Sequence, residues 1–208
     1  MIENLSLPVV LMLSTTGLAN GADPDPLHVS EVDAIECRLE ASDYRAFAFG
    51  VEGEEKIARK RGWKKVASRN PLLLEFDLPG PITVAHGYST RRIAFTADGI
   101  LAVLDLADPD VLAAQEQIEN MMDPEPMIAA IVASGKATRA QAESMIQFRK
   151  FLGEQVVQEV TEPATQQGGY GSRTKIARTI SNATTHPGKT FYGCSYRLEV
   201  LDENGEPL

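Results

Sequence analysis

Residues 70–106 read NPLLLEFDLPGPITVAHGYSTRRIAFTADGILAVLDL, and this stretch decides the fold. From Leu72 to Leu78 every second residue is apolar, with Glu75 and Asp77 at alternate positions. Such alternation is typical of a β-strand with one face on the core and the other in water. Pro79-Gly80-Pro81 interrupts it, because proline donates no backbone hydrogen bond, and we expect the ladder to break there.

The same stretch predicts further strands. Ile82, Val84 and His86 continue the alternation, and a following set ends at Asp98-Gly99, a strong hairpin-turn pair. Residues 100–106 are apolar at nearly every position. This pattern is typical of a strand that is buried on both faces in the middle of a sheet.

The flanking segments add both strands and helices. Alternation predicts strands at 35–41, 44–51, 156–160, 175–183 and 191–201, and charge distribution predicts a helix at 52–61. At Asp108-Pro109 the period becomes helical, and Thr138 with Gln141 matches a capping box. We therefore predict an α+β fold: an antiparallel sheet of about six to eight strands, with a helical segment at 108–152 packed on one face or edge.

The N-terminal residues resemble a secretory signal peptide. Residues 5–18, LSLPVVLMLSTTGL, are apolar and precede small residues at Ala19 and Ala22. This favours a signal peptide at 1–22, a single domain at 23–208 and a periplasmic or secreted protein. The apolar run is shorter than the about 20 residues of a membrane span, so no stable span is expected after its removal. Residues 1–4 contain no lysine or arginine; if the segment is instead structural, the protein is cytoplasmic.

The state predicted for the two cysteines depends on whether the N-terminal residues are a signal peptide. Cys37 and Cys194 each alternate with apolar residues, so we expect both to point inward from strands. In an oxidising compartment the two predict a disulfide, whereas in the cytosol they would be reduced core thiols.

Three scattered residues are the candidates for catalysis: His86, Asp105 and His186. No HExxH, CxxC or GxSxG motif is present, and the histidines lack the close spacing of metal ligands. We therefore expect neither a metal nor a cofactor.

The candidates for binding lie in two segments. Trp63, Lys64 and Lys65 belong to a basic run, which indicates either an anion-contacting patch or a solvated helix end with the tryptophan packed on the sheet. Tyr170 lies in the glycine-rich segment 162–172, which is either a binding loop or a simple connection.

Composition and motifs together favour a non-enzymatic exported binding or interaction protein. Its partner would be an envelope component or a small apolar ligand. The net charge of −9 argues against a nucleic-acid partner. The alternative is a hydrolase-type enzyme with a site assembled from the scattered candidates. Their convergence in one pocket would favour the enzyme.

Overall fold

The computed structural model describes residues 25–146, 149–166 and 168–208. Its strands are β1 Lys64–Val66, β2 Leu74–Val84, β3 Tyr88–Phe95, β4 Gly99–Leu104, β5 Leu152–Glu162, β6 Gly171–Ser181 and β7 Thr190–Leu201. Its helices are α1 Glu31–Ile35, α2 Ala41–Glu52, α3 Ile57–Lys60, α4 Pro109–Glu116, α5 Glu125–Ala133 and α6 Arg139–Met145, with 3₁₀ turns η1 Pro26–His28 and η2 Ala85–Gly87. The predicted signal peptide at 1–22 lies outside these residues.

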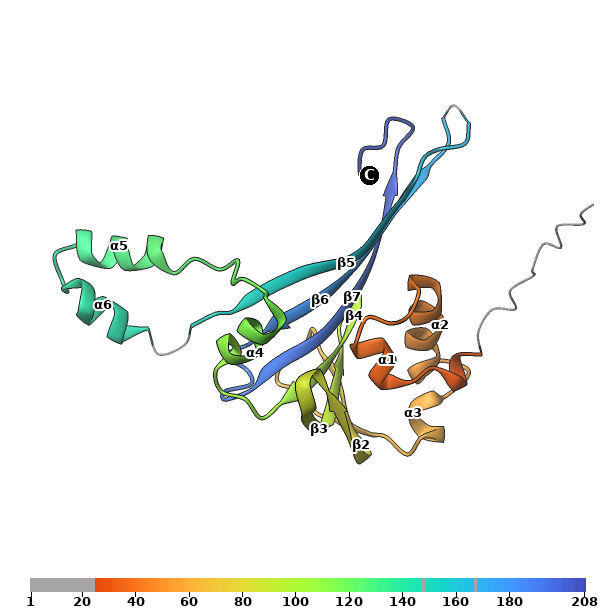
Figure 1. The fold of residues 1–208 in the computed structure, drawn as a ribbon, viewed down its shortest axis with the longest axis horizontal. Coiled ribbons are helices and arrows are strands. Elements are labelled where there is room, and N and C mark those ends of the chain that lie inside the picture. Colours follow the sequence, from red (N-terminus) through yellow and green to blue (C-terminus); the bar gives the residue numbers. More distant parts are fainter. Residues whose placement is uncertain (1–24, 147–148, 167) are drawn as a thin grey trace, which may run out of the picture.

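The predicted α+β fold is confirmed. All seven strands form one antiparallel sheet in the order β1-β2-β3-β4-β7-β6-β5. Figure 1 shows the sheet strongly twisted, with α1, α2 and α3 grouped on one side of it and β5, β6 and β7 extending as a long ribbon beyond the helices. Within the described ranges, no helix has the length and apolar character needed to cross a bilayer.

The stretch that decides the fold forms β2, β3 and β4. β4 is buried along its whole length and pairs with β3 on one side and β7 on the other, as its apolar sequence predicts. The expected break at Pro79-Gly80-Pro81 is only partial, because β2 runs through these residues. Its register with β3 shifts between Asp77 and Ile82, so an irregularity absorbs the prolines without ending the strand.

The main core lies between the sheet and the N-terminal helices. Phe47, Trp63, Phe76 and Phe95 form an aromatic cluster with ring centroids 5.7–6.4 Å apart. The opposite face of the sheet carries a smaller apolar cluster of Ala94, Leu101, Val103 and Phe191. Glu75, which the alternation assigned to a wet face, is only 1% exposed there.

The segment before the main sheet is helical, and the two strands predicted at 35–41 and 44–51 are wrong. Ser30 caps α1 by accepting hydrogen bonds from the Val32 and Asp33 amides. In α2 the buried side chains include Tyr44 and Phe47, whose spacing suits a helix. Tertiary packing of this face decides the structure, although alanine and phenylalanine also alternate in the sequence.

Because this segment is helical, Cys37 does not lie in a strand as predicted. Cys37 lies in the turn between α1 and α2, with φ of 57°, so only Cys194 occupies a strand. The helix predicted at 52–61 is a single turn, α3, which begins after Lys56.

The helical segment predicted at 108–152 contains three helices. Asp108 caps α4, and Thr138 and Gln141 form the predicted capping box at α6. α4 packs against β6. α5 and α6 pack on each other as a hairpin that projects away from the sheet (Figure 1).

Candidate functional site

A polar cleft of about 420 Å³ lies beside the cysteines. The turn after α1, the η2 turn, the end of α4, β5 and β6 all contribute to its wall. Its polar lining residues are Glu36, Arg38, Thr83, His86, Gln115, Glu116, Gln117, Gln155 and Arg178, and its apolar ones are Val32, Val84 and Ala85. Nine of its thirteen lining residues therefore carry hydrogen-bonding side chains.

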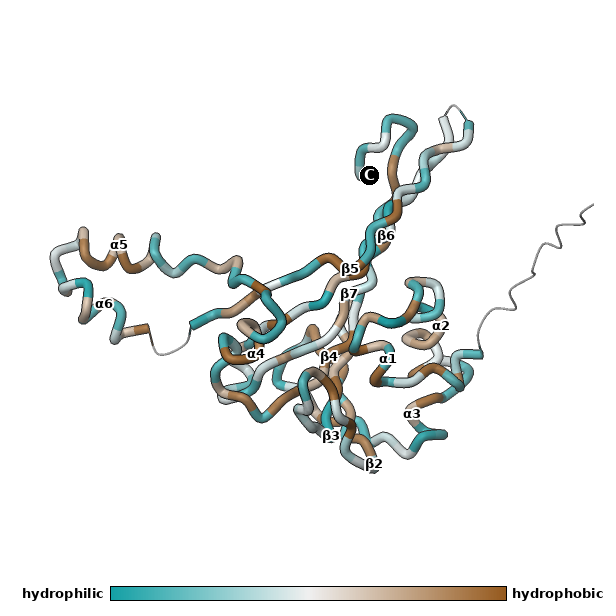
Figure 2. Tube along the Cα trace, viewed as in Figure 1, coloured by the Kyte–Doolittle hydropathy of each residue, from teal (hydrophilic) through white to brown (hydrophobic). Residues whose placement is uncertain are grey.

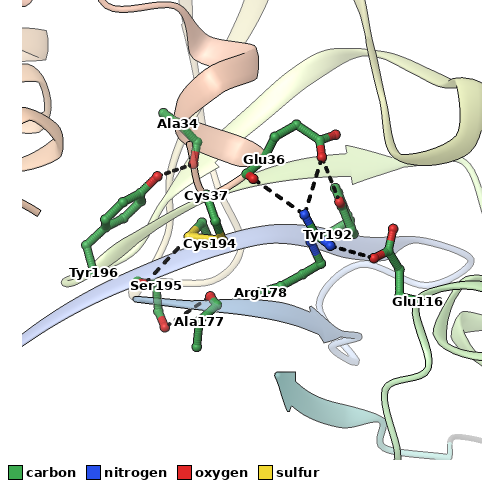
Figure 3. Close-up of a disulfide and its surroundings, with 10 residues drawn as sticks. All are labelled: Ala34, Glu36, Cys37, Glu116, Ala177, Arg178, Tyr192, Cys194, Ser195 and Tyr196. Atoms are coloured by element: carbon green, nitrogen blue, oxygen red, sulfur yellow. Dashed lines mark hydrogen bonds and ion pairs between the residues drawn. A yellow bond between two sulfur atoms is a disulfide. The ribbon is translucent and has the colours of Figure 1, made fainter. Parts of the chain in front are cut away.

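Arg178 is the centre of an ion network in the wall of the cleft. Its Nη1 donates to Glu116 Oε2 at 2.8 Å, and its Nη2 lies 3.7 Å from Glu36 Oε2 (Figure 3). The side chains of Glu36 and Glu116 are only 11% and 8% exposed. Arg178 is thus the permanently charged partner shared by both carboxylates, and buried ions are tolerated only when they are paired and hydrogen-bonded.

Glu36 connects the network to two other elements. Its Oε2 accepts a hydrogen bond from the Tyr192 hydroxyl at 3.0 Å, and its Oε1 accepts one from the Ala85 amide at 2.7 Å. Burial, followed by the charge of Glu36, raises the pKa of the Tyr192 hydroxyl. The tyrosine therefore stays neutral and keeps its proton available to the carboxylate.

His86 is the accessible titratable group of this arrangement. Its Nε2 lies 3.1 Å from Glu116 Oε1, and its side chain is 48% exposed. Among the described residues, Nδ1 of the same ring has no hydrogen-bond partner. The Glu116 carboxylate therefore lies beside one ring nitrogen, while about half of the His86 side chain remains accessible to a ligand.

The backbone around the cleft is strained. Five described non-glycine residues have positive φ, and three of them, Ala85, His86 and Gln117, line the cleft. A fourth, Cys37, stands between the lining residues Glu36 and Arg38. Conformations of this kind cost on the order of 1–3 kcal/mol each and concentrate at functional sites.

The disulfide anchors this side of the molecule. Cys37 and Cys194 are at bonding distance, with an Sγ–Sγ separation of 2.10 Å and Cα atoms 5.3 Å apart. Next to it, the Tyr196 hydroxyl donates to the Ala34 carbonyl at 2.7 Å (Figure 3). These two links fix α1 on β7 and so fix the position of Glu36.

The three candidates for catalysis do not come together in one site. His86 lies in the polar cleft with Glu116, whereas Asp105 is 85% exposed and pairs with Lys189. His186 lies against Phe191 on the opposite face of the sheet. Its Nε2 is 3.0 Å from Glu75 Oε1, and its Nδ1 is 3.0 Å from the Thr185 hydroxyl.

The four candidates for binding lie away from the polar cleft. Trp63 is 7% exposed within the aromatic cluster, while Lys64 beside it is exposed. Lys65 pairs with Glu52 at 2.8 Å. Tyr170 is 70% exposed in the connection between β5 and β6.

Sequence reasoning did not identify Glu36, Glu116 or Arg178. Arg178 is 142 positions from Glu36 and 62 positions from Glu116, and no local motif links the three. The one signal available in the sequence is that Glu36 precedes a cysteine.

The described residues contain no group of three or more histidine, cysteine, aspartate or glutamate side chains arranged to hold a metal ion. Comparison of the chain with protein family models, with curated proteins and with solved structures finds no match.

Proposed function

We propose that this is an exported, non-enzymatic binding protein whose polar cleft holds a polar ligand. The observation that carries the proposal is the ion pair of Arg178 with Glu116, because it holds the Glu116 carboxylate beside the exposed His86 in the cleft. Burying these charges costs desolvation energy that an apolar wall would avoid. Their role is to hold a binding group in one position before the ligand arrives, which lowers the entropy cost of binding.

The accessible groups of the cleft define the class of ligand. Gln115, Gln117 and Gln155 are exposed, and each amide both donates and accepts hydrogen bonds. The carboxylates of Glu36 and Glu116 are already occupied by partners within the protein. A neutral ligand rich in hydroxyl or amide groups fits these side chains, which favours an envelope component over a small apolar molecule.

Export is supported by the cysteine pair and by the leader-like sequence. Disulfides form and persist in oxidising compartments such as the periplasm. Intact mass of the full chain, expressed in a Gram-negative host, tests this part. A periplasmic species without about 19–22 N-terminal residues and with no free thiol supports export, whereas an uncleaved cytosolic dithiol contradicts it.

Binding is tested by NMR titration with two soluble probes, an N-acetylated oligosaccharide and a short neutral peptide. The chain has three histidines, so single glutamine variants assign their imidazole signals. We expect a saturable shift of the His86 signal with one probe. His86→Gln should abolish binding, while His28→Gln, which removes an imidazole that is 85% exposed and outside the cleft, should leave it intact. Saturable binding that leaves His86 unmoved, or no binding by either probe, contradicts the proposal.

A hydrolase-type enzyme is a second candidate, and one observation favours it. The His186 ring lies between two polar groups. Its Nδ1 is 3.0 Å from the Thr185 hydroxyl, and its Nε2 is 3.0 Å from the Glu75 carboxylate. This is the order of nucleophile, base and orienting acid in hydrolytic triads. A fluorophosphonate reagent tests it: a mass adduct on Thr185 that is lost in Thr185→Ala and kept in Thr184→Ala supports an enzyme. An unlabelled wild-type protein contradicts it.

A further inference from the structure

The α5–α6 hairpin exposes an apolar surface that is unusual for a free helix. We call residues 124–146, which contain this hairpin, the arm. Its first helix has the sequence EPMIAAIVA, of which Ile128 is the buried residue. Met127, Ala129, Ala130, Val132 and Ala133 are all exposed. Figure 2 shows this helix coloured as hydrophobic along most of its length. A helix that is apolar on all sides is normally surrounded by other protein.

Within the described residues, the elements outside the arm do not provide this cover. α5 packs on α6, and the hairpin stands away from the sheet in Figure 1. The two helices have nine and seven residues. Isolated helices shorter than about 12–15 residues are marginal in water, so tertiary packing has to stabilise them.

The charges of the arm identify the kind of partner. Glu125, Lys136, Arg139 and Glu143 are its charged residues, two of each sign. Arg139 donates to both oxygens of Glu125, at 2.6 and 2.7 Å, and to Glu143 at 3.0 Å. The arm is therefore neutral and largely satisfied internally, so an equally neutral and apolar surface is its complement.

We infer that the arms of two copies of this chain pack together as a four-helix bundle and make the protein a dimer. The arm exposes an apolar surface, and its zero net charge lets two copies meet there across a twofold axis although each whole chain carries −9. Two helical hairpins that meet face to face enclose a common core. The arm is small beside a standard interface of about 20–30 residues on each side, so its contacts have to be predominantly apolar.

A lipid surface suits the arm less well. Helices that lie in a membrane interface combine one apolar face with a strongly basic one. α5 has no basic residue, and the acidic chain would be repelled by anionic lipids. Lipid binding is therefore an outcome that the test distinguishes.

Sedimentation equilibrium of the oxidised full chain, over a concentration series, tests the inference. We expect twice the monomer mass for the wild type and the monomer mass for Met127→Glu/Val132→Glu. Phe49→Glu, a matched control on α2 that replaces a side chain that is 80% exposed, should remain a dimer. Emission of the sole tryptophan, Trp63, reports whether each variant keeps its core.

Three results would overturn the inference. The first is a wild-type protein that is monomeric throughout the series. The second is a dimer that persists in the arm variant while tryptophan emission stays native. The third is a wild-type monomer that sediments with anionic phosphatidylglycerol vesicles, with loss of this binding in the arm variant, because lipid would then be the partner.

Discussion

Cys37 and Cys194 are 157 positions apart in the sequence, and their Cα atoms are 5.3 Å apart in the fold. The bond between them fastens the turn that follows α1 to β7, which pairs with both β4 and β6. The residue on the N-terminal side of Cys37 is Glu36, whose carboxylate accepts hydrogen bonds from Tyr192 and Ala85 in the wall of the cleft. The covalent link and the ion network therefore share one short turn.

Removing the disulfide should lower stability without changing the fold. A cross-link that closes so long a loop restricts the unfolded chain, and its loss typically costs about 2–5 kcal/mol. Urea unfolding of Cys37→Ser/Cys194→Ser should show this decrease, and reduction of the wild type should reproduce it. An unchanged midpoint in both experiments would contradict the prediction.

Replacing Arg178 should destabilise the protein more than replacing a neighbouring arginine. Arg178→Met removes the shared guanidinium from two largely buried carboxylates, which costs roughly 3 kcal/mol, the low end for a broken buried pair. Arg173→Met, in the same strand, removes a partner of the more exposed Glu159 and Glu199 and should cost less than about 1 kcal/mol. Chemical denaturation of the two variants measures the difference, and equal losses would exclude a special role for Arg178.

Alkaline pH should unfold the protein through its buried tyrosines. Burial, the largest cause in each case, raises the pKa of Tyr44, Tyr192 and Tyr196 above the ordinary value of 10.0. Their contribution to stability is complete below pH 10.0 and is lost as the pH rises further, because the unfolded chain ionises first.

The expected slope is up to about 1.4 kcal/mol per pH unit for each tyrosine above that pH. Tyr192→Phe should flatten the dependence, whereas Tyr170→Phe, on an exposed side chain, should not change it. Near-ultraviolet absorbance of phenolate follows the ionisation. If all tyrosines form phenolates while circular dichroism remains native, burial does not raise the pKa of these tyrosines.

Gly193→Ala should disturb the pairing of β4 with β7. A methyl group at this position would approach the Ile100 carbonyl oxygen to 2.0 Å, so the strands would have to separate. Overpacking of this kind typically costs about 1–3 kcal/mol. Gly80→Ala has open space around it and should be close to neutral. Thermal unfolding compares the two, and a stable Gly193→Ala protein would show that the sheet adjusts.

The sequence predicted secondary structure correctly where the apolar pattern matches the actual burial of the side chains, or where the signal is local. β4 is apolar along its length because both faces are covered, and the capping residues of α4 and α6 act locally, so both could be predicted. α2 could not, because its alternating small and aromatic residues also suit a strand. Contact of Tyr44 and Phe47 with residues far along the chain decides its structure.

The polar cleft was only partly predictable. His86 was identified as a polar residue in an apolar strand pattern, although it lies in a strained turn after β2. Glu116 beside it and Arg178, which pairs with Glu116, come from α4 and β6, and the proximity of these elements is a property of the sheet order. No local pattern encodes that order.

The position of β7 also has a consequence for the order in which the sheet can form. β7 is the last strand along the chain, but it lies between β4 and β6 in the sheet. Until β7 pairs with both β4 and β6, β1–β4 and β5–β6 are separate pieces, each with an open edge and an incomplete core. Completion of the sheet therefore requires residues 190–201 to join two preformed pieces, and the many long-range pairings predict slow folding.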